Sequence, residues 1–502
     1  MHALDPANKD DYPCPSDALR LNEGSRVNAD LKSIRLDTQV DVADYRDKKR
    51  YAWLLTPVWV LMPALSVYLA CITGNAAYYW LTPVLLYFAM PLLDVVTGSD
   101  LNNPPESAVQ KLDEDHYYKY ILYVTVACHY LTLFVGAWAA GTQNLDWVAY
   151  AGLALSVGIM NGFAVATAHE LGHKKSAVER WLAKICLATG AYGQYMIDHN
   201  RGHHKEVATP EDSGSARFGE NFYQFAMRQL PHSTILRPWR LEKERLARAR
   251  KGPWTLTNEF LQPALISLMI YSALLVTYGL VLIPFLLSVA AIAYLFLTLA
   301  DFIEHYGLLR QKTPDGRYER VRPEHSWNTN HIASNIIFFH VQRHSDHHAW
   351  PTRRYQSLRN FDRLPTLPSG YPGMFGIALI PALWRTVMYP RVLAVYGGDV
   401  TKVNIEPTQR EEMLYRYAPH TETPACEPTS ITENFSRTPG TTAAALTTTR
   451  YECPGCGYTY DERVGDARQG FPAGTPWAQI PVQWSCPDCA VRDKPDFKRV
   501  ES

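Results

Sequence analysis

Nine of the 17 histidines in this 502-residue chain fall into four short clusters. Imidazole is the commonest neutral metal ligand in proteins, and nine rings exceed what one ion can bind. The clusters therefore predict two metal ions held almost wholly by nitrogen, a ligand set that suits Fe, Zn or Cu better than Mg or Ca. The predicted ligands are His169, His173, His199, His203, His204, His305, His344, His347 and His348. No separate catalytic acid or base is assigned.

Three of these clusters contain a histidine pair spaced i, i+4, which lies on one face of a helix and is expected to share an ion. The pairs are His169/His173, His199/His203 and His344/His348, with His204 and His347 expected to supply further ligands. Carboxylates beside metal-bound imidazoles usually orient the ring rather than bind the metal. That role is predicted for Glu170, Asp198, Asp301, Glu304 and Asp346. The remaining histidines are interpreted as ordinary polar residues, although His340 extends the predicted face of His344.

A second cluster of ligands lies near the C-terminus, where Cys453/Cys456 and Cys486/Cys489 form two CxxC pairs. Four thiolates in this arrangement predict a tetrahedral sulfur site for Zn or a single Fe. A segment of about 50 residues cannot build a sufficient apolar core without such a metal. Six aromatic residues are expected to pack around the pairs, and they favour iron over the alternative, a structural zinc ribbon. They are Tyr458, Tyr460, Phe471, Trp477, Trp484 and Phe497.

The histidine clusters sit at the ends of long apolar segments, each close to the ~20 residues that cross a hydrocarbon core. Six such segments, paired as three hairpins, predict a mostly α-helical protein with six transmembrane helices, a cytoplasmic histidine-rich helical cap and a small C-terminal iron domain. The segments are 52–73, 76–96, 118–140, 147–168, 262–279 and 280–302.

Orientation follows from the basic residues, which accumulate on the cytoplasmic side. The connections near 74–75, 141–146 and 278–283 contain no Lys or Arg, whereas 47–50, 174–180 and 201–251 contain many. Both termini and all metal ligands are therefore expected in the cytoplasm. The five remaining cysteines lack any pairing pattern, which fits a reducing compartment. The net charge is zero and no basic block indicates nucleic acid.

Four parts are predicted along the chain: an N-terminal cytoplasmic segment over 1–50, an integral-membrane domain over 51–405, a flexible linker over 406–450 and the cysteine module over 451–502. The linker prediction rests on its richness in Thr, Pro and Ser. The apolar stretch Met374–Met388 fits either a helix at the membrane interface or a buried core helix.

At these motifs the chain resembles the membrane alkane monooxygenases fused to a rubredoxin, over roughly residues 50–400 and 450–502. The family boxes HExxHK, EHxxGHH, NYxEHYG and LQRHSDHH are matched by 169–174, 198–204, 301–307 and 341–348. Residues 456–461 and 474–486 match the rubredoxin pattern. Departures are Asp198 for Glu, Asp301-Phe302 for Asn-Tyr and Ala490 for Gly; none replaces a ligand.

The resemblance implies a di-iron centre on the nine histidines and one iron on the four cysteines. It implies O₂-dependent hydroxylation of n-alkanes to 1-alkanols in a bacterial inner membrane. Electrons would come from the fused rubredoxin, itself reduced by a flavin-dependent NAD(P)H:rubredoxin reductase. Because an alkane has no polar group, recognition must come from burial, at ~0.8 kcal/mol per methylene.

Three alternatives remain. Related membrane hydroxylases act on other apolar substrates. A fatty-acyl desaturase also has histidine boxes over membrane hairpins, but the second box here is HxxxHH rather than HxxHH, and the carrier does not resemble a haem-binding domain. A metal transporter or sensor would place ionisable residues along a pathway inside the membrane, whereas these spans are nearly free of charge.

Overall fold

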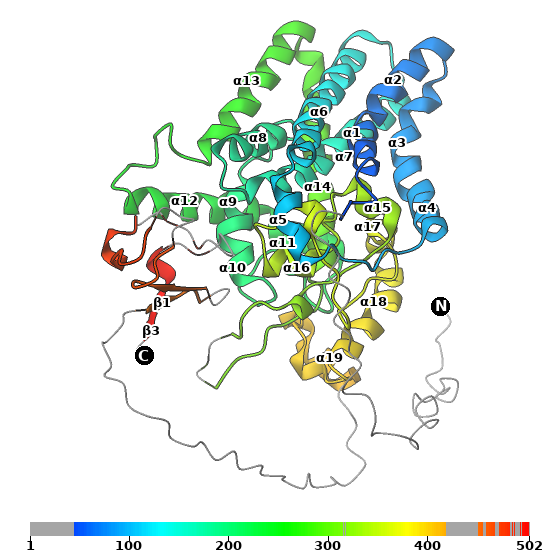
Figure 1. Ribbon diagram of the computed structural model, residues 1–502. Helices are drawn as coiled ribbons and strands as arrows, with labels where there is room; N and C mark the ends of the chain where they lie inside the picture. The colour runs from blue at the N-terminus through cyan, green and yellow to red at the C-terminus, as the bar shows by residue number, and fades with distance from the viewer. Residues whose placement is uncertain are drawn as a thin grey trace, which may run out of the picture. The chain divides into compact units, whose positions relative to one another are not determined.

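The computed structural model describes residues 45–314, 316 and 318–417, and near the C-terminus residues 450–454, 458–466, 471–481, 484, 486, 492 and 494–500. Most of the expected N-terminal segment and most of the expected linker lie outside the described residues. The described part is mostly helical, with one small β-sheet near the C-terminus (Figure 1).

Five helical segments in the described residues are long and apolar enough to cross a membrane. They are η3 to α4 (Ala76–Thr97), α6 (His116–Thr142), α7 (Trp147–Gly172), α13 (Leu261–Tyr278) and η7 with α14 (Leu280–Glu304). A sixth forms if the bent pair Ala52–Val60 (η2 and α1) and α2 (Met62–Thr73) counts as one span. The protein is therefore a multi-pass membrane protein, as the apolar segments predict.

The bend between α1 and α2 measures 56°. Pro63 stands in the first turn of α2, and its missing N–H and its ring prevent the helix from continuing straight. The tight turn after α2 needs a left-handed residue, which Gly74 provides with φ +67°. Asn75 then caps the next helix by accepting a hydrogen bond from the Ala77 amide. The first hairpin thus follows directly from local sequence.

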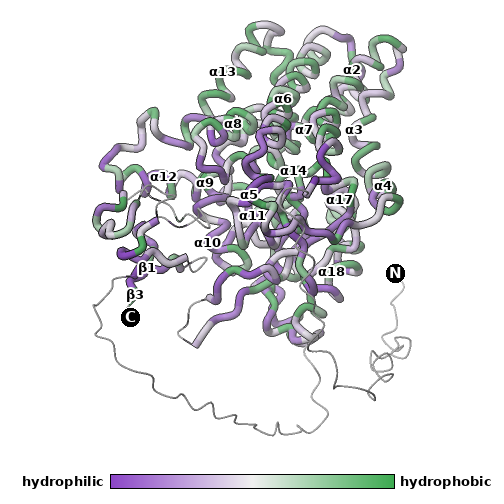
Figure 2. Tube along the Cα trace, in the orientation of Figure 1, coloured by the Kyte–Doolittle hydropathy of each residue, from purple (hydrophilic) through white to green (hydrophobic). Residues whose placement is uncertain are grey.

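Helix α7 is the central span and packs against α6, α14 and α8 (Ala177–Ala188). It is apolar on all sides, as expected for a helix surrounded by others. Close packing with α14 depends on small residues, because a Cβ at Gly158 or Gly162 would lie 2.6 Å and 2.7 Å from side-chain atoms of Ile292 and Phe296. Figure 2 shows the apolar spans gathered at one end and the polar segments at the other.

The connecting segments form a layer of short helices at the end of the bundle where α7 and α14 finish (Figure 1). They include α5 (Glu106–Glu114), α9 (Tyr195–Asp198), the π-helical turn η5 (His199–His203), α10 (His204–Glu206), α11 (Phe222–Pro231), the π-helical turn η6 (His232–Leu236), α12 (Arg237–Arg248), α15 (Ile332–Ile337), α16 (His344–Ala349), α17 (Tyr371–Ala378), α18 (Pro381–Val395) and α19 (Arg410–Tyr417).

The stretch Met374–Met388 covers most of α17 and the first half of α18, and it has features of both expected environments. Met374 and Trp384 are buried in the main core, whereas Ile380 and Leu383 are exposed. The segment is therefore a core element with an apolar outer edge.

The C-terminal module has an antiparallel sheet in the order β2-β1-β3, made of β1 (Arg450–Glu452), β2 (Thr459–Asp461) and β3 (Lys498–Val500). Tyr451 pairs with Tyr460 on β2 and with Arg499 on β3. The predicted aromatic cluster is confirmed: Tyr458, Tyr460, Phe471, Trp477 and Phe497 all lie within ring-contact distance of Trp484.

Candidate metal centre

All nine predicted histidines converge in the structure and form two buried groups. One group holds His169, His173, His199, His204 and His347, and the other holds His203, His305, His344 and His348. Within each group the candidate ligand atoms lie within 4.8 Å of one another. Two nitrogens on opposite sides of one ion are ~4 Å apart, so each group has the dimensions of a single metal site.

Each group is assembled from segments far apart in the chain. His169 lies in the last turn of α7 and His173 caps that helix. His199 and His203 belong to η5, His204 begins α10, and His305 caps α14. The last three rings come from the short helix α16. The ends of two spans therefore supply three of the rings, and short helices outside the spans supply the other six.

The expectation that His199 and His203 share an ion is wrong. His199 belongs to the five-histidine group and His203 to the four-histidine group. The reason is local: residues His199–His203 form a π-helical turn, which has more residues per turn than an α-helix and is frequent at functional sites. The π turn brings residue i+5, rather than i+4, beside His199, and the Nε2 atoms of His199 and His204 are 3.1 Å apart.

In each of the other two i, i+4 pairs, both histidines belong to the same group. His169 and His173 are both in the five-histidine group, and His344 and His348 are both in the four-histidine group with their Nε2 atoms 2.9 Å apart. His347 joins the other group, where its Nε2 lies 3.1 Å from Nε2 of His204. A single turn of α16 thus contributes to both sites.

Several rings are held through Nδ1, which leaves Nε2 for a metal. The Tyr195 hydroxyl lies 2.8 Å from Nδ1 of His199, and the His325 carbonyl accepts at 2.9 Å from Nδ1 of His305. Tyr195 precedes His199 by four residues, so helical spacing could have identified it. The contact with His325 links residues 20 apart through a loop and has no sequence signature.

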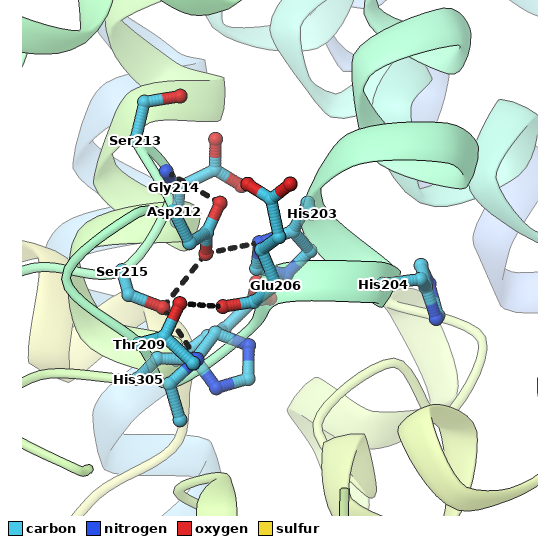
Figure 3. A network of polar contacts seen from close by, with 12 residues as sticks. His203, His204, Glu206, Thr209, Asp212, Ser213, Gly214, Ser215 and His305 are labelled. Atoms are coloured by element: carbon cyan, nitrogen blue, oxygen red, sulfur yellow. Dashed lines mark hydrogen bonds and ion pairs between the residues drawn. The ribbon is translucent and has the colours of Figure 1, made fainter. Parts of the chain in front are cut away.

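The most extensive support surrounds Nδ1 of His203, which lies 2.8 Å from Oδ2 of Asp212 (Figure 3). The same carboxylate accepts hydrogen bonds from Ser215 Oγ at 2.7 Å and the Gly214 amide at 3.1 Å, and faces Arg237 at 3.4 Å. Gly214 is required by proximity, since a Cβ there would lie 2.8 Å from the His203 ring. Sequence reasoning missed Asp212, because it lies in an irregular loop nine residues after His203.

The protonation of this pair follows from burial and charge. Burial raises the pKa of the Asp212 carboxyl, but His203 and Arg237 outweigh it and hold that pKa well below its usual value. Burial lowers the pKa of His203, but Asp212 outweighs it and raises the pKa to about 9. Asp212 is therefore an anion that accepts a hydrogen bond from Nδ1–H of His203. With a pKa of about 9 the ring is protonated at both nitrogens near neutral pH, so a metal that binds Nε2 must displace the proton on that atom.

Most of the other rings outside the spans are neutral, the form that binds metals. Burial lowers the pKa of each well below the usual histidine value, and the neighbouring histidines lower it further. These rings are His173, His199, His204, His344, His347 and His348.

Metal binding also accounts for three ring nitrogens that have no hydrogen-bond partner among the described residues. Nε2 of His169, His173 and His203 are buried without such a partner, which is rare for polar atoms inside proteins. A metal ion in each group would satisfy them. The residues present therefore fit the two metals that the sequence predicts.

The five carboxylates predicted to orient rings lie around the centre, but their partners differ. Glu304 approaches a ring directly, with Oε2 3.3 Å from Nε2 of His344. The other four pair with cations or with an amide. Glu170 pairs with Lys174 at 2.9 Å and Asp198 with Arg237 at 3.2 Å, Asp301 accepts from Gln229 at 2.5 Å, and Asp346 binds Arg353 at 2.8 Å.

His340 belongs to neither group. Its Nδ1 lies 2.9 Å from the Tyr355 carbonyl, its Nε2 lies 3.2 Å from Lys49 Nζ, and its ring packs edge-on against Trp53. It is a buried hydrogen-bonded residue, in agreement with its interpretation from the sequence as an ordinary polar residue.

An apolar cavity opens beside the histidines between α7 and α14. Polar groups occur at its inner end, where His169, Asp301 and Glu304 face it and the Tyr371 hydroxyl donates to Glu304 at 3.1 Å. The rest of the lining is mainly apolar: Val165, Ala166, Phe296, Leu297, Ala300, Phe338 and Val341.

In the C-terminal module the structure describes two of the four predicted ligands, Cys453 and Cys486, and both are buried. The Cys453 amide donates to the Tyr458 carbonyl at 2.8 Å and the Cys486 amide to the Arg492 carbonyl at 2.7 Å. Cys456 and Cys489 lie outside the described residues.

Comparison with known proteins agrees with both parts of this architecture. The fatty acid desaturase family matches residues 145–377 and the rubredoxin family matches residues 450–497. The alkane 1-monooxygenase of Ectopseudomonas oleovorans is 49% identical over 374 residues, which cover 74% of this chain and 93% of that protein. Alkane 1-monooxygenase 1 of Alcanivorax borkumensis is 48% identical and is covered to 92%. Rubredoxin-2 of the same organism is 58% identical over 53 residues, which cover 11% of this chain and 30% of that protein.

The fold and the histidine groups define a membrane oxidoreductase of the histidine-box type, with a rubredoxin module attached. More narrowly, the chain belongs to the alkane 1-monooxygenase family. The family resemblance predicted from the four histidine boxes is thereby confirmed.

Proposed function

We propose that the protein hydroxylates n-alkanes at a terminal carbon, at a di-iron centre held by the nine histidines. The single observation that carries this proposal is the pair of buried histidine groups, one of which borders an apolar cavity through His169. Membership of the alkane 1-monooxygenase family selects the reaction and the substrate class. Iron is proposed over zinc or copper because the same chain carries a rubredoxin domain, which implies a one-electron iron carrier.

The reaction balances as alkane, O₂, two electrons and two protons giving 1-alkanol and water. The bound iron ions would supply the binding and reduction of O₂. The chain supplies the rest. The apolar lining between α7 and α14 would keep water from the alkane, and Nδ1 partners orient the rings of His199, His203 and His305. At the inner end, the Tyr371 hydroxyl and Glu304 Oε1 hold a proton beside the cavity.

The electrons are proposed to arrive through the rubredoxin domain, whose single iron would be held by Cys453, Cys456, Cys486 and Cys489. This carrier passes one electron at a time, so each turnover requires two reductions. A flavin-dependent NAD(P)H:rubredoxin reductase is the proposed source. A tether between the domains would keep the local concentration of the carrier near the mM range.

We also place the protein in a bacterial inner membrane with both termini and both histidine groups in the cytoplasm. The distribution of Lys and Arg supports this orientation, because the three short connections at the opposite end lack both residue types. The proposed division is an N-terminal segment over 1–50, a hydroxylase domain over 51–405, a linker over 406–450 and the rubredoxin domain over 451–502.

The test is product analysis under ¹⁸O₂ with the purified full chain in nanodiscs, NADH and a rubredoxin reductase. We expect one ¹⁸O atom in 1-octanol or a longer 1-alkanol, and about three irons per chain. A second candidate, desaturation, is favoured by the family match over residues 145–377. An unsaturated product without ¹⁸O would support desaturation and reject hydroxylation. Zinc in the histidine groups would reject both, because zinc has no redox chemistry.

A further inference from the structure

We propose that α11 and the π turn η6 after it lie inside the membrane, in the leaflet next to the metal centre, with one face against lipid acyl chains. The connection between α8 and α13 would then be partly a monotopic membrane element rather than an entirely aqueous cap. The occupant of this exposed face is the hydrocarbon of the bilayer.

Helix α11 contacts a membrane span far from that span's end. The Tyr294 hydroxyl donates to the Ala226 carbonyl of α11 at 3.3 Å. Tyr294 stands about 11 residues into α14, or ~16 Å along a helix that rises 1.5 Å per residue. The hydrocarbon core is ~30 Å thick, so this contact falls near its middle.

Contacts closer to the end of α14 give the same placement. Phe222 and Phe225 pack against Phe302 with ring centroids 5.9 Å and 5.5 Å apart, and Gln229 binds Asp301. Helix α11 therefore runs beside the second half of a membrane span. A segment at that depth is surrounded by lipid wherever it is not covered by protein.

The uncovered face of α11 and η6 is largely apolar. Its exposed polar residues are Gln224, whose side chain accepts a hydrogen bond from the Asn221 amide, and His232. Met227 is 71% exposed and Leu236 57%, and Tyr223, Leu230 and Ile235 are also exposed. Throughout Phe222–Leu236, which the structure describes in full, no Asp, Glu, Lys or Arg is exposed. Large exposed apolar patches mark interaction or membrane surfaces.

The arginine of this segment is turned inward. Arg228 binds Glu220 at 2.8 Å and donates to the carbonyls of Ser213 and Ser215. It is thus neutralised on the protein side of α11, as a lipid-facing helix requires. The apolar face continues onto α18, because Tyr223 donates to the Leu379 carbonyl beside exposed Ile380 and Leu383.

The residues after η6 have the composition of a membrane interface. Helix α12 and the next turn expose Arg240, Lys243, Arg248, Arg250 and Lys251, then Trp254 at 78% and Leu256 at 84%. Cations and tryptophan in succession are typical of the headgroup level. The chain therefore passes from an apolar face to an interfacial one, which favours lipid over a protein partner as the occupant of the α11 face.

Because Gln229 on the inner side of α11 contacts Asp301 at the cavity, this placement puts the lipid one helix away from the metal centre. If the substrate is an alkane, as proposed above, it dissolves in the hydrocarbon of this same leaflet. This consequence rests on the proposed function, whereas the membrane placement does not.

The experiment measures lipid exposure directly with a nitroxide at Met227→Cys, in the full chain in nanodiscs of phosphatidylcholine and phosphatidylglycerol. The background replaces Cys14, Cys71 and Cys426 by Ser; Cys128 and Cys186 are buried. Power-saturation EPR compares collisions with apolar O₂ and with the water-soluble nickel chelate NiEDDA. The reference labels are Leu268→Cys, exposed on span α13, and Glu324→Cys, exposed outside the spans.

We expect the ratio of O₂ to NiEDDA accessibility at position 227 to match that at position 268 and to exceed that at position 324 several-fold. Ile235→Cys should give the same result and serves if Met227→Cys loses iron or fails to fold. A ratio like that of position 324 at both sites would place α11 in water and overturn the proposal. Low accessibility to both reagents would mean that protein covers the face, and would overturn it too. Neither outcome depends on hydroxylase activity.

Discussion

Replacing Asp212 by Asn tests whether the carboxylate behind His203 determines metal binding. The substitution keeps size and shape but removes the charge that faces Nδ1 of His203 and Arg237. If the new amide nitrogen faces the ring, it donates to Nδ1 and moves the ring proton to Nε2, the atom that must bind the metal. Loss of such a partner typically weakens metal affinity 10–100-fold, or ~1.4–2.7 kcal/mol.

The loss should be confined to one group, because Asp212 contacts His203 and His203 belongs to the four-histidine group. We therefore expect the Asp212→Asn chain to release one iron at roughly 10–100-fold lower chelator concentration, while the five-histidine group keeps its metal. Iron per chain is measured after equilibration with a chelator series, and Mössbauer spectra identify the remaining site. Both readouts are independent of turnover.

The matched control is Asp94→Asn. Asp94 is as fully buried as Asp212, but it accepts a hydrogen bond from the Ser334 amide of α15, a helix that carries none of the nine rings. Its replacement should lower the melting temperature without separating the two irons. Equal iron release from both groups in Asp212→Asn, or unchanged affinity, would refute the assignment of Asp212 as the residue that orients His203.

Four further outcomes are expected. The His347→Ala chain should lose the iron of the five-histidine group and all hydroxylase activity. The His340→Gln chain should keep the iron of both groups. Equal iron loss in both variants would contradict the assignment of His347, but not His340, to a metal site. Cys486→Ser should bleach the rubredoxin absorption, and added free rubredoxin should restore activity; activity without any carrier would argue against the fused domain as donor. Ala166→Leu should narrow the cavity and shift the relative kcat/KM toward shorter alkanes, and an unchanged preference would exclude this wall as the length determinant. Burial opposes ionisation of Glu259, but the neighbouring cations outweigh it and hold its pKa at about 2. Its stabilisation of ~3 kcal/mol is therefore present above pH ~4.5 and is lost as the pH falls toward 2, and melting curves of Glu259→Gln should lack this acid dependence.

The sequence by itself determined the chemistry and the local elements. Histidine spacing identified the nine rings that converge, and runs of apolar residues identified the spans, because both are set by helical periodicity and by the thickness of the bilayer. The aromatic cluster of the rubredoxin domain was equally visible, since so small a segment has no other apolar material for a core.

Only the tertiary structure decided how the rings divide between two sites. The π turn at His199 places His204 rather than His203 beside it, and no residue pattern distinguishes that turn from an α-helical one. Asp212 was equally hidden, because a loop brings it to His203 and loop conformation depends on contacts with Arg237 and Ser215. Periodic local geometry can be predicted from residue spacing, whereas contacts across irregular backbone depend on the packing of the whole fold.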